Sequence, residues 1–238
     1  MHLPTLVERL NNPHMTDIEK TVRKTHIEFI KSIKTSDTMH LLSVSCGDGI
    51  WDYLSAISNP AIKNITATDI VDNPVRSSDQ AFLLSVVSWK FQKVMPESPL
   101  PFDNESFDIV MHHDVIEHTY KPYLFLEEQF RVLKKGGFLL LGTPNLFRPA
   151  NLAKLLLGKL TFPIKIGYYE EIGDYIHIQE FHQQQLSLML QEIGFSIVTI
   201  RHCYWGIFPL RIKFSDFPKS QLGKSLCHYL FFLCQKPL

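Results

Sequence analysis

Short apolar runs alternate along this chain with segments in which apolar residues recur every three or four positions. The short runs predict buried strands, and the three-to-four spacing predicts amphipathic helices. Strands are predicted at residues 41–44, 62–68, 90–94, 107–112, 138–141, 195–201 and 228–234. Because helical segments separate most of these runs, the pattern predicts an α/β fold with a mainly parallel, doubly wound sheet.

An amphipathic helix is predicted ahead of the first strand. Thr16 stands three residues before Glu19, which is the spacing of a capping box. From there to Ile33 the apolar side chains keep helical spacing, so we expect a helix that covers the sheet or the site. The first twelve residues are expected to be a short lead-in. Further helices are predicted at residues 50–57, 74–88, 123–133 and 182–193.

The length of 238 residues suits a single domain with decoration. Within it we expect an N-terminal helical cover at 1–36, a core at 37–145, an insertion at 146–181 and the rest of the sheet at 182–238. The insertion is set apart by its Leu, Phe, Tyr and Lys content and by the break at Pro163.

Composition excludes several classes of protein. Lys plus Arg equals Asp plus Glu, 24 against 24, whereas nucleic-acid binding typically needs a basic excess. The four cysteines include no CxxC pair, which disfavours a disulfide framework or zinc site and favours a reducing cytoplasm. No apolar run approaches the roughly 20 residues of a membrane helix, and a signal-peptide core is lacking. The oligomeric state is left open.

A turn of small residues joins the first predicted strand to its helix. Cys46-Gly47-Asp48-Gly49 bends where only small residues fit, and it leaves backbone N–H groups free for a carboxylate, phosphate or ribose. Asp69 stands 20 positions beyond Gly49, at the tip of the second strand. That spacing suits a carboxylate that accepts both hydroxyls of a ribose. A solvated loop acid or helix cap is the alternative.

Several segments, in order and spacing, resemble the class I S-adenosylmethionine-dependent methyltransferases. Residues 42–49 look like their first motif, and Leu-Pro-Phe-Asp-Asn-Glu-Ser-Phe-Asp-Ile-Val at 100–110 looks like their lead into the fourth strand. Similar segments follow at 117–118, 130–137, 143–145, 177–181 and 192–195. The resemblance covers residues 41–200. Within the family, the chain is similar to the methyltransferases that act on quinones and lipids.

The resemblance implies a Rossmann-like seven-stranded sheet whose last strand is antiparallel, with S-adenosylmethionine as cofactor. In this family the glycine turn packs on the methionine end, the acid after the second strand holds the ribose, and the next residue touches the adenine. Carried over, the implied cofactor-binding residues are Ser45, Cys46, Gly47, Gly49, Asp69, Ile70, Pro96, Glu97 and His112.

The chain departs from the family at three places. Ser43 replaces a usual acid, and Ser45 replaces a usual glycine. The acid usual just beyond the third strand is not clearly placed, because Glu97 is the only carboxylate among residues 95–97. Ser45 fits the turn if its backbone is not left-handed. These departures keep open a catalytically degenerate binding protein. A nicotinamide oxidoreductase is disfavoured, because Asp52 stands where a third glycine would allow close helix packing.

Methyl transfer from a sulfonium needs an acceptor held in line and water kept out. We expect a small-molecule acceptor, with oxygen as the methylated atom, and a histidine as general base. The catalytic candidates are His113 and His177, ahead of His118 and His182; a hydrogen-bonding or surface role is the alternative for each.

Three further patterns allow two interpretations each. On a helix, Asp114, Glu117 and His118 would share one face and could hold a divalent ion, but we expect a structural pair and no metal. Residues 152–160 form either a buried cap helix or a peripheral membrane contact. Five aromatic residues either line an acceptor pocket or pack in the core; these are Phe162, Tyr168, Tyr169, Tyr175 and Trp205.

Overall fold

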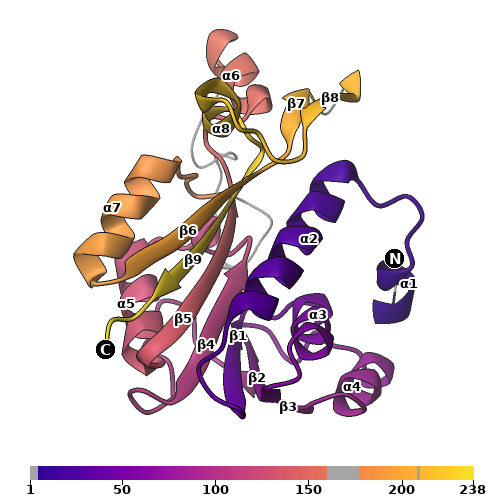
Figure 1. Cartoon of the computed structure of the whole chain (residues 1–238), viewed down its shortest axis with the longest axis vertical. Coiled ribbons are helices and arrows are strands. Elements are labelled where there is room, and N and C mark those ends of the chain that lie inside the picture. Colours follow the sequence, from indigo (N-terminus) through magenta and orange to yellow (C-terminus); the bar gives the residue numbers. More distant parts are fainter. Residues whose placement is uncertain (1–4, 160–176, 208–209) are drawn as a thin grey trace.

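The computed structural model describes residues 5–159, 177–207 and 210–238. A seven-stranded sheet with the order β3-β2-β1-β4-β5-β9-β6 runs through it (Figure 1). Its strands are β1 (Met39–Val44), β2 (Ile62–Asp69), β3 (Ser88–Lys93), β4 (Phe107–His113), β5 (Leu133–Pro144), β6 (Ser196–Cys203) and β9 (Tyr229–Gln235). All seven strands predicted from the apolar runs are therefore confirmed.

The strands from β3 to β5 pair in parallel, whereas β9 is antiparallel to both of its neighbours, β5 and β6. The last strand of the chain thus lies inside the sheet, and β6 forms its edge. This is the doubly wound, Rossmann-like arrangement with an antiparallel last strand that the resemblance implied.

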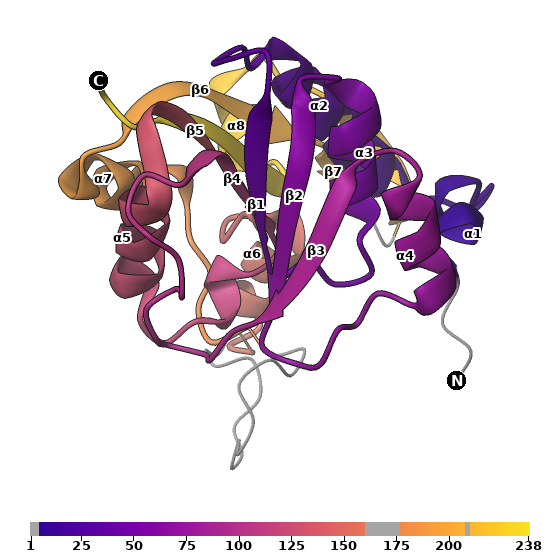
Figure 2. The same cartoon turned by 90° about the horizontal axis from the view of Figure 1, so that it is seen from below.

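Helices cover both faces of the sheet (Figure 2). α2 (Asp17–Ser32) and α3 (Ile50–Ser58) lie on one face, and α5 (Pro122–Val132) and α7 (Gln183–Ile193) on the other. The remaining helices are α1 (Leu6–Leu10), α4 (Ser77–Leu84), the short 3-10 helix η1 (Ile116–His118), α6 (Pro149–Leu156) and α8 (Gln221–Ser225). The short hairpin β7 (Trp205–Ile207) and β8 (Ile212–Ser215) stands apart from the main sheet.

Alternate residues of each central strand belong to different halves of the core. Leu41, Ile109 and Leu140 pack with α2 and α3 on one face. Their chain neighbours Leu42 and Val110 pack with α5 and α7 on the other. This period of two is why near-continuous apolar runs mark strands that are covered on both sides.

Two local predictions need correction. The first twelve residues are not a plain lead-in, because Thr5 and Glu8 form a complete capping box that starts α1. The basic and glycine residues 134–137 do not close α5 but begin β5, since the helix already ends at Val132. At the start of α2, the Thr16 hydroxyl accepts from the Glu19 N–H, as predicted. The Glu19 carboxylate does not complete a capping box but accepts from Arg23.

A buried carboxyl lies beneath the glycine turn. Asp52 of α3 is fully buried, and its Oδ2 accepts a hydrogen bond from Trp89 Nε1 at 2.7 Å. Burial raises the pKa of Asp52 to about 6, against hydrogen bonds from Ser43 and Trp89 that lower it. Ser43, at the position where the family usually has an acid, is buried as well, and Asp52 Oδ1 has no hydrogen-bond partner among the described residues.

We expect Asp52→Asn to stabilise the protein in a pH-dependent way. The pKa of this group is raised in the folded state, so folding takes up protons between about pH 4 and pH 6 and stability falls as pH rises through that window. The loss is at most about 3 kcal/mol. In thermal unfolding, the variant should have a higher midpoint temperature than the wild type above pH 6 and the same midpoint below pH 4. The exposed Asp72→Asn is the matched control; equal gains at both pH values would contradict the assignment.

Candidate active site

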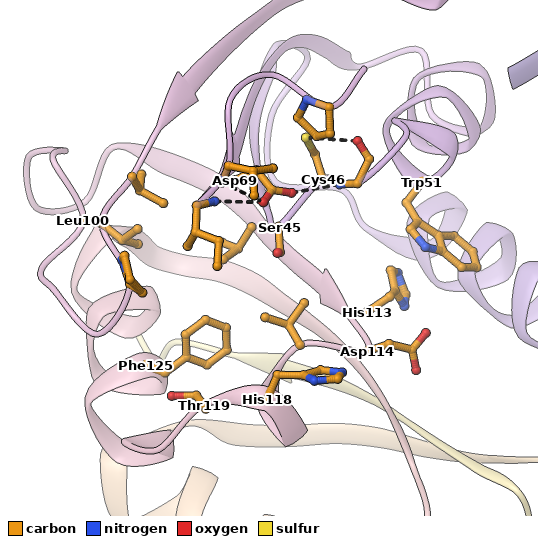
Figure 3. A pocket seen from close by; sticks show the side chains of 18 of the residues that line it. Ser45, Cys46, Trp51, Asp69, Leu100, His113, Asp114, His118, Thr119 and Phe125 are labelled. Atoms are coloured by element: carbon orange, nitrogen blue, oxygen red, sulfur yellow. Dashed lines mark hydrogen bonds between the residues drawn. The ribbon is translucent and has the colours of Figure 1, made fainter. Parts of the chain in front are cut away.

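A cavity of about 1020 Å³ opens at the carboxyl ends of β1, β2 and β4. Strand order reverses between β1 and β4, and the loops that follow these two strands diverge there. Figure 3 shows Ser45, Cys46 and Asp69 on one side of the cavity and His113, Asp114 and His118 on the facing side. The topology therefore brings the glycine turn and the histidines into one space.

The turn after β1 is tied to the tip of β2 by one carboxylate. Asp69 Oδ2 accepts from the Gly47 N–H at 3.2 Å, and its Oδ1 accepts from the Ile70 N–H at 2.8 Å. Gly47 has φ +54°, and a Cβ added there would meet nothing within 4 Å. Free space beside a buried carboxylate and small residues is what an adenosyl group with ribose hydroxyls requires.

The backbone of Ser45 is left-handed, contrary to the condition under which a serine fits this turn without strain. Its φ is +57°, in the left-handed region, where a residue with a Cβ costs about 1–2 kcal/mol relative to the right-handed region. The position at which the family usually has glycine is thus strained in this chain, and it lies in the wall of the cavity.

The structure brings most of the predicted cofactor residues to the cavity and leaves two outside it. The lining includes Ser45, Cys46, Gly47, Asp69, Ile70, Pro96 and Glu97. Gly49, with φ +80°, instead packs α3 against Leu83, whose Cδ1 would be 3.1 Å from an added Cβ. His112 is buried against Phe125, with ring centroids 5.0 Å apart, and is not in the lining.

Glu97 joins two loops at the cavity rather than standing free. Its Oε1 accepts from Thr119 Oγ1 at 2.7 Å and from the Tyr120 N–H at 3.0 Å. The loop after β3 is therefore held against the segment after η1, and both contribute to the wall.

Helix α1, which the sequence did not predict, lines the cavity beside the glycine turn. Arg9 of α1 lines the cavity and forms an ion pair with Asp48. The Leu6 N–H donates to Asp79 Oδ1 at 3.1 Å, which fixes the start of the helix. The Thr5–Glu8 spacing was the one available signal for this helix.

His113 is held by a chain of hydrogen bonds. Its Nε2 lies 3.0 Å from Nδ1 of His26, whose Nε2 lies 2.9 Å from Ser55 Oγ. The Ser55 hydroxyl donates to the carbonyl of Trp51 at 2.7 Å, so it accepts from His26 Nε2–H. His26 Nδ1 must then accept from His113 Nε2–H, which leaves the lone pair of His113 on Nδ1.

The surroundings of His113 keep it neutral. Burial, with smaller contributions from His26 and His112, holds the pKa of His113 well below its usual value. A Cβ on Gly142 would lie 2.6 Å from both His113 Nδ1 and Tyr229 Oη, so glycine is needed there for the two side chains to fit. His113 Nδ1 is itself buried and has no hydrogen-bond partner among the described residues, so His113 is a weak base and a part of the cavity wall.

His177 has the geometry of an oriented general base. Its Nδ1 is 2.5 Å from Glu180 Oε1, and the buried Glu180 is also bonded by Arg148 and by Asn151 Nδ2 at 2.7 Å. Burial raises the pKa of Glu180, but the hydrogen bonds from His177, Arg148 and Asn151 outweigh it and the pKa is lowered. The ionised carboxylate holds Nδ1–H, which leaves Nε2 of this cavity-lining imidazole free to accept a proton.

The residues that could bind a metal ion are not the set considered from the sequence, which was Asp114, Glu117 and His118. Asp114 precedes η1 with φ +54°, so the expected helical face does not form. Instead, ligand atoms of Glu117, His118 and His177 all lie within 4.8 Å of one another. Burial raises the pKa of Asp114 to about 6 and, with the charge of Asp114, raises that of Glu117 well above its usual value. The Glu117 carboxyl can therefore donate a hydrogen bond as well as accept one.

Other predicted residues lie away from the cavity. His182 is the N-cap residue of α7, and its ring stacks on Phe147 with the centroids 5.1 Å apart. His118, by contrast, lines the cavity, where its ring is edge-on to that of His177 at 5.0 Å. Trp205 packs on Phe214 in the hairpin and is not in the lining. The other aromatic candidates lie outside the described residues; these are Phe162, Tyr168, Tyr169 and Tyr175.

Comparison with known proteins gives a consistent family. The Methyltransf_11 family, a methyltransferase domain, matches residues 42–141. Demethylmenaquinone methyltransferase of Protochlamydia amoebophila is 29% identical over 134 residues, covering 54% of each chain. A ubiquinone biosynthesis O-methyltransferase of Hydrogenovibrio crunogenus is 26% identical over 119 residues, covering 50% of this chain and 48% of the relative. The chain thus spans about half the length of these curated relatives.

Solved structures share the fold over most of the chain. An S-adenosylmethionine-dependent methyltransferase of Methanosarcina mazei has a TM-score of 0.59 at 20% identity, covering 86% of this chain and 95% of that one. The [4+2]-cyclase SpnF has a TM-score of 0.65 at 18% identity, covering 95% and 85%. At such identities the likeness concerns the fold alone. Residues 42–141 are therefore a methyltransferase domain, and the sheet order and glycine turn around them are those implied by the resemblance to the class I S-adenosylmethionine-dependent methyltransferases.

Proposed function

We propose that this protein transfers the methyl group of S-adenosylmethionine to an oxygen atom of a small-molecule acceptor. The observation that carries the proposal is the cavity itself. The Asp69 carboxylate and the glycine turn line this cavity, and so does the imidazole of His177, which Glu180 orients. The cofactor supplies a methyl group that is already activated, so the chain must bind, orient and exclude water.

On the donor side, Asp69 would accept the ribose hydroxyls and the turn from Ser45 to Gly47 would hold the methionine end. Ile70 and Pro96 would offer apolar contacts to the adenine. Each of these residues lines the cavity. The hydrogen bond from Gly47 to Asp69 keeps the two parts of the donor site at a fixed separation before any ligand binds.

On the acceptor side, His177 would take the proton of the reacting hydroxyl on Nε2 while Glu180 balances the imidazolium charge. Asp114, which lines the cavity, would hold a second oxygen of the acceptor. Trp51 and Phe125 give the cavity aromatic walls. An aromatic ring with neighbouring oxygens suits these groups, and the names of the two curated relatives, for demethylmenaquinone and for O-methylation in ubiquinone biosynthesis, support such an acceptor.

The proposal is tested by supplying S-adenosylmethionine with a tritiated methyl group and a demethylmenaquinol or an alkylated catechol. We expect label in the organic extract and S-adenosylhomocysteine in the aqueous phase, with mass spectrometry showing the new methyl on oxygen. Label on ring carbon would overturn the oxygen assignment. Tight binding of S-adenosylhomocysteine by calorimetry with no transfer to either acceptor class would favour the degenerate binding protein, which the strain at Ser45 keeps as the second candidate.

We expect methyl transfer to be independent of a divalent ion. The pKa of Glu117 is raised well above its usual value, which favours a neutral carboxyl and hence a weak cation ligand, and Glu117 already accepts from Thr143 Oγ1 at 3.0 Å. Turnover should change by less than about twofold on addition of EDTA. A loss that magnesium restores would instead assign a cation to Glu117, His118 and His177.

We place the protein in the cytoplasm. Cys46, Cys203, Cys227 and Cys234 are all free and buried thiols, and such thiols suit a reducing compartment.

A further inference from the structure

We propose that α6, the β7–β8 hairpin and α8 together form a surface that binds anionic membranes. These elements gather at one end of the molecule (Figure 1). We call this the α6–hairpin surface and define it by residues 147–159, 205–207 and 210–226. It is separate from the groups that line the cavity, with which it shares no residue.

Large apolar side chains are exposed across this surface. At the end of α6, Leu155, Leu156 and Leu157 are 58%, 87% and 68% exposed. Residues of the hairpin and α8 are similarly exposed; these are Leu210, Ile212, Phe214 and Leu222. The expectation of a buried cap helix therefore fails for the described part of residues 152–160, because the leucines point to solvent.

The charge of the surface is one-sided. Asp216 is its single acidic residue among the described positions, and it pairs with Lys213, which also pairs with Asp17 of α2. Apart from Lys213 and from Arg148, which pairs with Glu180, the surface carries five basic residues; these are Lys154, Lys159, Arg211, Lys219 and Lys224. The whole chain, by contrast, has 24 basic and 24 acidic residues. Exposed leucine and phenylalanine with interleaved lysine and arginine match a bilayer with anionic headgroups, where the apolar groups enter the interface and the cations stay at its surface.

A second copy of the chain is a poorer partner for the same surface. Two such surfaces would bring like charges together, which opposes pairing. Within the described residues no helix is long and apolar enough to cross a bilayer, so attachment would be peripheral.

The position of the surface connects it to the cavity. β5 and β6 both run towards the end of the sheet that holds the cavity, and α6 and the hairpin directly follow them. Arg148, just before α6, bonds the same Glu180 that orients His177. If the proposed function holds, this placement would let an acceptor dissolved in the bilayer reach the imidazole; membrane binding itself does not depend on that function.

Flotation with vesicles tests the proposal without any assay of methyl transfer. The full chain should float with vesicles of phosphatidylcholine and phosphatidylglycerol, and much less with phosphatidylcholine alone. Added salt should weaken the binding to anionic vesicles. Failure of the wild type to bind anionic vesicles would overturn the proposal and leave the proposed function standing.

Paired variants locate the surface. Leu155→Ser with Leu156→Ser should lower partitioning by about tenfold or more, and Lys154→Gln with Lys159→Gln by about fivefold for each lysine. The control is Leu84→Ser with Leu188→Ser, which are exposed at 58% and 53% on α4 and α7. Thermal unfolding checks that each variant folds. Equal losses in the control pair, or a dimer in sedimentation that the Leu155 and Leu156 changes disperse, would contradict the assignment.

Discussion

The Asp69→Asn variant is expected to bind S-adenosylhomocysteine about ten to a hundred times more weakly than the wild type. A carboxylate that accepts two hydroxyl hydrogen bonds contributes about 1.5–3 kcal/mol, and each 1.4 kcal/mol is tenfold in affinity. The amide also brings an N–H group to a position where the Gly47 and Ile70 N–H groups already donate. Isothermal calorimetry measures the loss directly.

The control for this experiment is Asp72→Asn, which removes the same charge three residues further on. Asp72 is exposed and pairs with Lys93 on the surface, and it does not line the cavity. Thermal unfolding separates a binding effect from a structural one, since Asp69 also ties the turn to β2. Unchanged affinity in a folded Asp69→Asn protein would show that the donor does not bind where we place it.

The His177→Ala variant is expected to lose turnover by about a hundredfold to ten-thousandfold while its affinity for S-adenosylhomocysteine stays the same. A positioned general base contributes a factor of this size. His177 lines the cavity and contacts His118, which faces the glycine turn from the other side in Figure 3. The turnover is measured with the acceptor that becomes labelled in the tritium assay. The affinity for S-adenosylhomocysteine is measured by calorimetry.

His182→Ala is the matched control, because His182 lies five residues away and stacks on Phe147 outside the cavity lining. It should leave turnover within about twofold of the wild type. If His177→Ala retains full turnover, the proton must leave through water or another group, and the base assignment is lost.

The sheet could be predicted from sequence because its strands are covered on both faces. Runs such as residues 41–44 and 138–141 are apolar at nearly every position, which marks a buried strand without any knowledge of its partners. The position of Asp69 beside the glycine turn could be predicted for a similar reason, because the spacing from Gly49 to Asp69 reflects the length of the helix and strand that join them.

The acceptor side could not be predicted in the same way, because its contacts join distant parts of the chain. His26 has the helical spacing of a core residue, and nothing in its neighbourhood indicates the bond to His113. Arg9 reaches the cavity from a helix of five residues, which is too short to show a period. The partnership of His177 with Glu180 required the orientation of both side chains, which sequence spacing alone does not give.

The internal position of β9 has a consequence for biosynthesis. β6 is made before β9 but pairs only with it in the main sheet, so residues 196–203 leave the ribosome without a partner strand. Until residues 229–235 emerge, both β5 and β6 present open edges, which are prone to pair with other chains. Nascent chains arrested before residue 229 should therefore depend on holding chaperones, and release from them should coincide with insertion of the final strand.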